Sequence, residues 1–241
     1  MNLIIIKNEE LGKDGKTVIG GVRAKHIISI LKGETGQVLK IGILNGPIGK
    51  GTILGISNET VTLQCIFSEE LPGEPRIDLI LAMPRPKVMK RLLAPLASLG
   101  ISRIFLTNAV RVERDYFDTH WLKKEYYEPL LIEGLQQASG TSMPEISVIK
   151  RLKPFVEDRL DELFPHTLRF LAHPGAKEKI SAHRAEGKGI LLALGPEGGW
   201  VDYEVAMFEE QGFSPVSMGK RILRTDTACI GLVSVIREIV Q

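Results

Sequence analysis

A glycine-rich stretch is the part of this sequence whose residue types and spacing most directly suggest chemistry. Residues 195–199 read GPEGG, and they follow the apolar run 190–194. Glycines allow positive φ and let backbone N–H groups come within hydrogen-bonding distance of a ligand. A tight turn would use the same glycines for geometry alone, and Glu197 would favour the start of a following helix without binding anything. The stretch therefore predicts either a ligand-binding loop or a plain turn.

Two further segments favour the ligand-binding interpretation. In MGKRILRTDTA (218–228), Lys220, Arg221 and Arg224 come just before a helix start, where the positive end of the helix dipole disfavours cations. A solvated surface loop tolerates this arrangement, but cations gathered at a helix N-terminus more often accompany a bound anion. A third apolar run is followed by HPG (173–175). Together the three segments predict a single cleft.

Strands and helices that alternate along the second part of the chain must position these segments. Apolar runs predict strands at 77–83, 103–107, 168–172, 189–194 and 216–218. The spacing of apolar residues predicts helices at 87–99, 121–137, 203–211 and 225–240. This alternation predicts an α/β domain with a mostly parallel sheet covered by helices. Ligands bind at the carboxyl ends of the strands in such sheets, which is where the three segments fall.

The first part of the chain has a different character. Residues 36–67 predict three strands separated by turns at 45–47 and 58–59, and residues 22–33 predict a short helix. Small β-barrels and sandwiches are built from such strands. Two prolines and a glycine within 71–77 suggest a linker. We therefore expect two domains, 1–72 and 73–241.

Composition and missing motifs disfavour several classes of function. Of the 241 residues, 44% are hydrophobic and 25% are charged, as in ordinary soluble globular proteins. The net charge of +2 is small, so a polyanion could be bound only by local clusters of basic side chains. The two cysteines lie far apart and the five histidines lack metal-ligand spacing, so no disulfide framework and no metal site are expected. No apolar run suits a signal peptide or a membrane span, which predicts a cytoplasmic protein without membrane contact. GxGxxG, GxxxxGKS or GxxxxGKT, and GxSxG are missing, which disfavours a dinucleotide fold, a P-loop and serine chemistry.

Two motifs carry a resemblance to a known family. LLALGPEGGW (191–200), followed by SMGKRILRTDTA (217–228), resembles the SPOUT (trefoil-knot) superfamily of RNA methyltransferases. Within that superfamily it is similar to the RsmE-type 16S rRNA uridine-N3 methyltransferases. RAKHIISILKGETGQVLKIGILNG (23–46) resembles the family's N-terminal domain through His26, Leu31 and Lys32. The resemblance implies an α/β protein with a C-terminal trefoil-knotted methyltransferase domain, a small N-terminal PUA-like β-barrel, S-adenosylmethionine as cofactor, and a homodimer.

The resemblance also implies roles for individual residues. Three groups are expected to bind the cofactor: Leu171, Ala172 and His173; Leu194, Gly195, Pro196, Glu197 and Gly198; and Met218, Gly219, Arg221, Ile222 and Leu223. Arg224 is expected to stabilise negative charge that develops on the uracil. Asp226 is expected to accept the N3 proton or to orient Arg224, with a plain helix-start acidic residue as the alternative.

Basic side chains in both domains are candidates for phosphate contacts with 16S rRNA or the small ribosomal subunit. They are Arg23, Lys25 and Lys32 in the first domain, and Arg85, Lys87, Lys90, Arg91, Arg111 and Arg114 in the second. For each one, a solvated surface cation is the alternative. The target base is expected to be splayed out of folded RNA to reach the cleft.

Departures from the family pattern make the methyl acceptor less certain than the cofactor. Gln136, Ser139 and Gly140 replace the usual Glu, Gly and Arg, whereas Ser98 and Asp226 stand where Glu is usual. Two alternatives therefore stay open. One is a knotted enzyme that methylates a ribose 2′-hydroxyl or a guanine, and the other is a non-catalytic RNA-binding module in ribosome assembly.

Overall fold

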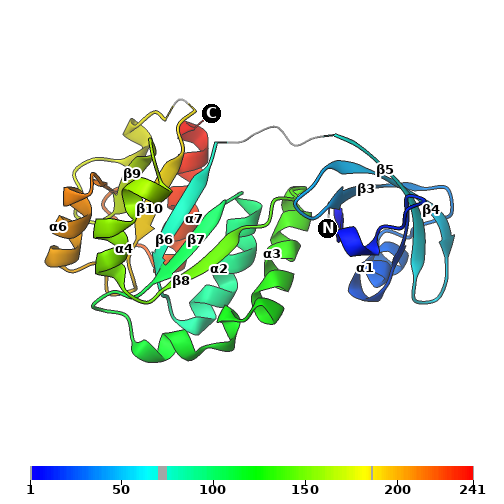
Figure 1. Cartoon of the computed structure of the whole chain (residues 1–241), viewed down its shortest axis with the longest axis horizontal. Coiled ribbons are helices and arrows are strands. Elements are labelled where there is room, and N and C mark those ends of the chain that lie inside the picture. The colour runs from blue at the N-terminus through cyan, green and yellow to red at the C-terminus, as the bar shows by residue number, and fades with distance from the viewer. Residues whose placement is uncertain (1, 70–74, 186, 241) are drawn as a thin grey trace. The chain divides into compact units, whose positions relative to one another are not determined.

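The computed structural model describes residues 2–69, 75–185 and 187–240, which form two compact units (Figure 1). The first unit consists of Met1–Gly73 with Ile132–Met143, and the second of Glu74–Leu131 with Pro144–Gln241. Each unit has its own sheet and its own apolar core. The two units are therefore described separately.

The first unit is a curled, mixed five-stranded sheet with short helical segments (Figure 1). Its strands are β1 (Ile4–Ile6), β2 (Lys16–Ile19), β3 (Val38–Ile43), β4 (Ile48–Ile56) and β5 (Val61–Glu69), in the order β1-β3-β4-β5-β2. Strand β1 is parallel to β3, and the other pairs are antiparallel. Within residues 2–69 no ladder joins β1 to β2, so a closed PUA-like barrel stays a prediction.

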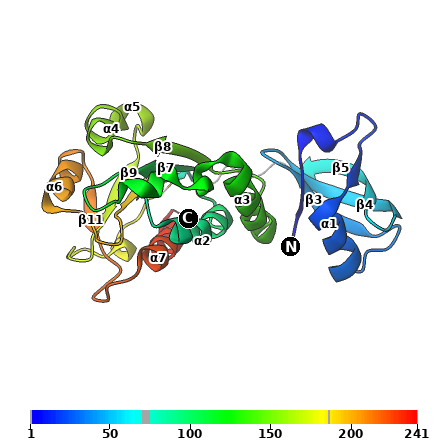
Figure 2. The same cartoon turned by 90° about the horizontal axis from the view of Figure 1, so that it is seen from below.

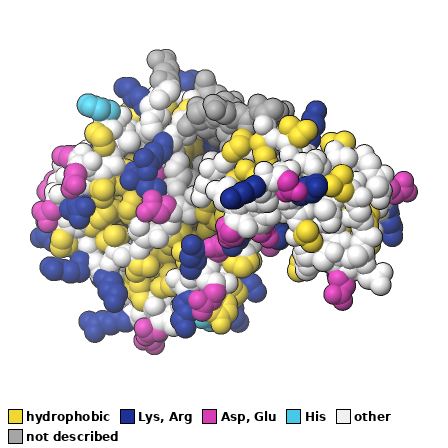
Figure 3. Space-filling model, turned by 45° about the vertical axis from the view of Figure 1, so that its right-hand side comes forward, with side chains coloured by type: hydrophobic (Ala, Val, Ile, Leu, Met, Phe, Trp, Pro, Cys, Tyr) yellow, Lys and Arg dark blue, Asp and Glu magenta, His cyan; other side chains and the backbone are white. Residues whose placement is uncertain are grey.

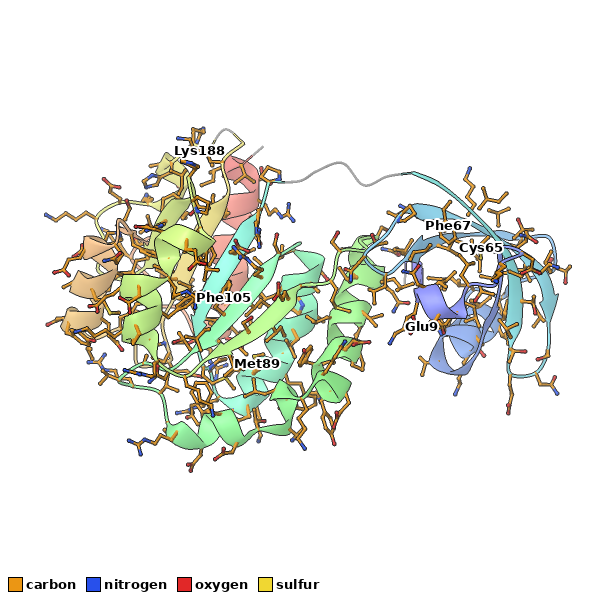
Figure 4. The ribbon with its side chains drawn as sticks, in the orientation of Figure 1. Glu9, Cys65, Phe67, Met89, Phe105 and Lys188 are labelled. Atoms are coloured by element: carbon orange, nitrogen blue, oxygen red, sulfur yellow. The ribbon has the colours of Figure 1, made fainter. Side chains whose placement is uncertain are left out.

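The apolar side of this sheet is closed by the helical segment that the sequence predicts at 22–33. It consists of α1 (Gly21–Lys25) and a π-helical turn (His26–Ile30), with Ala24 and Ile27 fully buried. Figure 4 marks Cys65 and Phe67 on β5 in this unit, and both belong to or pack against its core. Ile6, Ile19 and Leu63 are fully buried in the same core.

Residues 132–143 pair with the first unit, a grouping that the sequence does not reveal. The backbone N–H groups of Asn2 and Leu3 both donate to the Gln136 carbonyl, over 3.0 and 3.1 Å. The Thr141 hydroxyl donates to the Gly46 carbonyl over 2.7 Å. These bonds join residues more than ninety positions apart, so no local pattern signals them.

The second unit is built on a six-stranded sheet in which every neighbouring pair is parallel. Its strands are β6 (Ile77–Ala82), β7 (Arg103–Thr107), β8 (Glu145–Ile149), β9 (Leu168–Ala172), β10 (Ile190–Leu194) and β11 (Ser214–Val216), in the order β11-β9-β10-β6-β7-β8. The predicted α/β domain with a mostly parallel sheet is thus confirmed. The buried strands β6 and β10 are apolar on both faces except for Asp78, because helices cover both faces.

Helices of the second unit lie on both faces of this sheet (Figures 1 and 2). They are α2 (Pro86–Ser98), α3 (Lys124–Ala138), α4 (Leu152–Asp158), α5 (Leu160–Leu163), α6 (Asp202–Glu210) and α7 (Thr225–Ile239). The part of α3 from Ile132 onward belongs to the first unit. Helices α4, α5 and α6 share one core cluster with β6, β7, β9 and β10. Phe105 of β7 points into that cluster (Figure 4), where its ring centroid lies 5.3 Å from those of Phe155 and Phe164. Helices α2 and α7 pack against each other on the opposite face.

Most predicted elements of the second unit match, and the exceptions lie at the two edges of the sheet. The predicted strand at 216–218 is wrong by two residues, because β11 spans Ser214–Val216 and includes Pro215. Proline is tolerated there since β11 is an edge strand. The opposite edge strand, β8, was not predicted, nor were the short helices α4 and α5. None of the described helices has the length and apolarity to cross a bilayer.

Candidate active site

The carboxyl ends of three neighbouring strands open onto one cavity of about 390 Å³. Leu194 of β10 and Val216 of β11 both align with Ala172 of β9, so the three loops leave the sheet at the same level. The loops supply the lining residues 172–175, 194–200 and 216–219, and the segment before α7 adds 221–223 and Thr225. The three segments singled out by their residue types therefore meet in space.

Almost every residue predicted to bind the cofactor lines this cavity. Those that do are Ala172, His173, Leu194, Gly195, Pro196, Glu197, Gly198, Met218, Gly219, Arg221, Ile222 and Leu223. Leu171 is the exception, because its side chain is fully buried in the core cluster beneath the loops. Ile222 lines the cavity and is 85% exposed, so its apolar side chain is accessible to a ligand.

The glycine loop is both a turn and a wall of the cavity. The Gly199 N–H donates to the Pro196 carbonyl over 2.8 Å, and Gly199 has a φ of +73°. A Cβ on Gly195 would lie 3.2 Å from the backbone nitrogen of Trp200, and one on Gly198 would lie 2.9 Å from Cδ of Arg111. Gly199 is thus favoured by its φ, whereas a side chain at Gly195 or Gly198 would crowd Trp200 or Arg111.

Arg111 comes from the loop after β7 and lies over the glycine loop. Its Nη1 donates to the Gly198 carbonyl, and its side chain lines the cavity. The buried Glu204 holds the two loops together, because its carboxylate accepts from the N–H groups of Val110 (2.8 Å) and Val201 (3.0 Å). Sequence analysis missed Glu204, whose only local signal is its place in the first turn of α6.

Trp200 contributes an unsatisfied donor to the cavity wall. The residue lines the cavity and is 5% exposed, yet its indole Nε1 has no hydrogen-bond partner among the described residues. Buried indole N–H groups usually have a partner. The wall of the cavity therefore contains a buried donor without a partner, for which the sequence gives no signal.

A second cavity of about 360 Å³ adjoins the first. It is lined by Arg85, Val88, Arg91, Glu197, Ile222, Leu223, Arg224, Thr225 and Asp226. Glu197, Ile222, Leu223 and Thr225 line both cavities. The two residues predicted to be catalytic therefore lie in a compartment next to the predicted cofactor residues.

Asp226 is paired with Arg91 of α2 in this second cavity. Arg91 Nη2 lies 2.6 Å from Oδ2, and Oδ1 accepts from the Thr227 N–H over 3.0 Å. Burial raises the pKa of Asp226, but the hydrogen bonds from Arg91 and Thr227 and the nearby Arg224 charge outweigh it, so the pKa lies below its usual value. Arg224 itself is exposed and occupies the N-cap position of α7.

Glu197 is held by the start of α2 rather than by a side chain. Its Oε1 accepts from the backbone N–H of Arg85 over 3.1 Å. This bond connects the glycine loop to the segment after β6, across 112 positions of sequence. One carboxylate thus faces both cavities while one of its oxygens is fixed.

Comparison with known proteins agrees with this geometry. A family model described as an RNA methyltransferase domain matches residues 72–237. The chain is 32% identical to the ribosomal RNA small subunit methyltransferase E of Treponema pallidum, over 98% of this chain and 90% of that protein. The chain belongs to this RNA methyltransferase family. A second relative, ribosomal RNA small subunit methyltransferase E 1 of Borreliella burgdorferi, is 28% identical over 95% of this chain and 94% of its own length.

Solved structures of similar fold cover almost the whole length of this chain. The ribosomal RNA small subunit methyltransferase E of Neisseria gonorrhoeae, solved with S-adenosyl methionine, has a TM-score of 0.78 at 19% identity and covers 100% of this chain and 98% of its own. A Legionella pneumophila protein described as a methyltransferase, solved with bound SAM, has a TM-score of 0.78 at 23% identity, with coverages of 98% and 97%. The family resemblance inferred from the two sequence motifs is confirmed by the family model and the curated relatives.

The basic residues predicted to contact RNA differ in how free their charges are. Arg23 is engaged within the first unit, where it pairs with Glu10 and donates to the Ile5 carbonyl over 2.8 Å. The hydrogen bond from Arg23 holds the pKa of Glu10 below its usual value. Lys25, Lys32 and Lys87 are exposed, whereas the exposed Arg85 interacts with Tyr116, whose hydrogen bond raises the Arg85 pKa.

Two more of the basic side chains predicted to contact RNA already have partners within the second unit. Arg91 pairs with Asp226, and the Lys90 ammonium lies 4.8 Å from the ring centroid of Trp121. Figure 3 shows Lys and Arg side chains spread among Asp and Glu over the visible face, which fits the small net charge. Any contact with a polyanion therefore depends on local groups of cations.

Proposed function

We propose that this protein transfers the methyl group of S-adenosylmethionine to N3 of a uridine in small-subunit ribosomal RNA. The single observation that carries the proposal is the meeting of the three strand-end loops in one cavity, in a member of the RNA methyltransferase family. Relatives over nearly the whole chain are named for methylation of small-subunit ribosomal RNA. Uridine N3 as the acceptor follows from the resemblance to the RsmE type alone.

The first cavity suits S-adenosylmethionine in size and chemistry. Its volume of about 390 Å³ falls in the usual range for small-molecule sites, roughly 300–1,000 Å³. Leu194, Val216 and Leu232 provide apolar surface for a purine ring. The strand-end backbone and the unsatisfied Trp200 N–H provide donors for its polar atoms. The predicted cofactor residues are retained with these roles, except that Leu171 acts through the core beneath the loops.

The second cavity suits the acceptor base. Methylation at N3 removes the N3 proton, so negative charge develops on the uracil oxygens as the reaction proceeds. Arg224 lines this cavity and is exposed within it, so its guanidinium is available to that charge. A preorganised donor of this kind contributes about 3–4 kcal/mol to a transition state. Because Asp226 is held by Arg91, we assign it to orienting the cations of the cavity rather than to accepting the proton.

Three larger features belong to the same proposal. The first unit is proposed to be a PUA-like RNA-binding domain, with Lys25 and Lys32 among its phosphate contacts. The segment of the second unit that carries 217–228 and α7 is proposed to form the trefoil knot, as in SPOUT enzymes. The active protein is proposed to be a homodimer that meets 16S rRNA or the assembled small subunit.

Two measurements test the proposed function. Calorimetry of the purified protein is expected to show binding of S-adenosylmethionine, and no binding would favour a non-catalytic RNA-binding module. Nucleosides from the 16S rRNA of a strain lacking the gene, compared with the complemented strain by mass spectrometry, are expected to lack one 3-methyluridine. Loss of a 2′-O-methyl nucleoside or a methylguanosine instead would identify the other acceptor class.

A further inference from the structure

Glu197 is the carboxylate that lies where the two cavities meet. It lines both of them, and its side chain is exposed to them rather than buried in the loop. If the first cavity holds the methyl donor and the second holds the acceptor base, the methyl group must cross this boundary. Glu197 would therefore lie close both to the methyl group of the donor and to the acceptor base.

The two carboxylates of the acceptor cavity differ in their free oxygens. Asp226 uses Oδ2 for Arg91 and Oδ1 for the Thr227 N–H. Glu197 uses Oε1 for the Arg85 N–H, and its Oε2 has no hydrogen-bond or ion-pair partner within the described ranges. Only Glu197 thus combines a fixed position with an oxygen that is available to a substrate.

We infer that Glu197 is the general base of the reaction, with Oε2 taking the N3 proton of the acceptor uridine. This inference rests on the proposed function and deepens it. The N3–H bond breaks and its proton moves to Oε2, while the N3 electron pair forms a bond to the methyl carbon. The carbon–sulfur bond breaks with its electron pair left on sulfur, so the products are 3-methyluridine and S-adenosylhomocysteine. The protonated carboxyl then returns its proton to water.

Asp226 is less suited to act as the general base. The ion pair with Arg91 stabilises the charged form of Asp226 and lowers its pKa, which makes it a weaker base. The hydrogen bond from the Arg85 N–H occupies Oε1 of Glu197 and leaves its other oxygen for proton transfer, with the Arg85 guanidinium within electrostatic range of the carboxylate. The Arg85 bond serves to aim the carboxylate at the boundary between the cavities.

The substitution Glu197→Gln separates proton transfer from positioning. The Gln amide oxygen still accepts the Arg85 N–H, but the side chain cannot take a proton. We expect E197Q to bind S-adenosylmethionine within about threefold of the wild type by calorimetry. General base catalysis contributes at least ~100-fold, so its single-turnover methylation of small subunits at neutral pH is expected to fall by about that factor. The residual rate is expected to rise with pH, as more N3 becomes deprotonated in solution.

Two controls give the experiment a clear outcome. Glu210→Gln removes an exposed carboxylate at the end of α6 and is expected to leave the rate unchanged. Asp226→Asn is expected to cost less than E197Q and to leave the shape of the pH profile intact. A rate for E197Q within about fivefold of the wild type, or a loss explained wholly by weaker cofactor binding, would overturn the inference. Failure of the wild type to bind S-adenosylmethionine or to form 3-methyluridine would instead contradict the proposed function.

Discussion

At the scale of single residues, the site depends on groups whose hydrogen bonds are incomplete within the protein. The Trp200 indole N–H and Glu197 Oε2 both have no partner in the described part of the chain, and both belong to lining residues of the first cavity. Of the two groups only the Trp200 N–H is buried, and buried polar groups without a partner are rare in native proteins because each costs free energy. A bound ligand is one source of such a missing partner.

Trp200→Phe is expected to weaken binding of S-adenosylmethionine without loss of the fold. Phenylalanine keeps the aromatic contact with Phe208, whose ring centroid lies 5.0 Å away, but removes the N–H. A hydrogen bond contributes about 0.5–1.5 kcal/mol, so the dissociation constant measured by calorimetry is expected to rise by roughly two- to twelvefold. Trp121→Phe is the matched control, because Trp121 is outside the cavity lining. Equal effects of the two variants would contradict the assignment.

At the scale of elements, the two ends of the parallel strands have different roles. The carboxyl ends of β9, β10 and β11 carry the cavity, whereas the opposite end of β6 carries a buried ion-pair network. Asp78 has a side chain that is 1% exposed and accepts from Arg103 over 3.0 and 2.7 Å. Arg103 also stacks over the Phe164 ring, with its guanidinium carbon 4.5 Å from the centroid. We therefore expect this network to contribute to stability and not to methyl transfer.

Removing one member of that network is expected to destabilise the second unit strongly. Arg103→Met leaves the Asp78 charge buried beside only Arg76, and breaking a buried pair in this way costs about 3–5 kcal/mol in the free energy of unfolding. Urea denaturation followed by circular dichroism measures the loss. Arg159→Met breaks the exposed pair with Glu162, and it is expected to cost less than about 1 kcal/mol. The double variant Asp78→Leu with Arg103→Met is expected to recover part of the stability, and failure to recover any would argue against a charge effect.

At the scale of the whole molecule, each unit protects one cysteine in its core. Cys65 lies in the sheet of the first unit and Cys229 in α7 of the second, and both are buried. Burial raises the pKa of Cys65 to about 11, and burial together with the Asp226 charge raises that of Cys229 to about 12. Because the thiolate is the reactive form, both thiols are expected to be inert in the folded protein.

Alkylation of the two cysteines measures how well each unit protects its buried thiol from solvent. Iodoacetamide at pH 8 is expected to leave both thiols unmodified in the native protein and to modify both in urea, as read from intact mass. The folded pKa values exceed the unfolded one, so the folded state keeps protons that the unfolded state releases. The free energy of unfolding is therefore expected to fall as pH rises from about 9 to about 12. Native labelling of Cys229 at its unfolded rate would contradict the burial of α7.

Much of the second unit was predictable because its signals are local. The strands 103–107 and 168–172 match β7 and β9 at both ends, and the predicted helix at 225–240 matches α7 within one residue. The edge strands β8 and β11 were missed or misplaced, since edge strands carry weaker apolar patterns and tolerate proline. In the first unit β3, β4 and β5 were predicted, whereas β1 and β2 are short and lie at the edges.

By itself the sequence determined which residue types stand at the strand ends, because glycine, proline and charge are read directly along the chain. It therefore identified the loops at 173–175, 195–199 and 218–228, and through the motifs at 191–200 and 217–228 the methyltransferase family. Only the tertiary structure decided which groups meet. Arg91 reaches Asp226 across 135 positions, and the Arg85 N–H reaches Glu197 across 112. Those contacts depend on the order β11-β9-β10-β6-β7-β8, and strand order is set by packing between distant segments, which local periodicity does not encode.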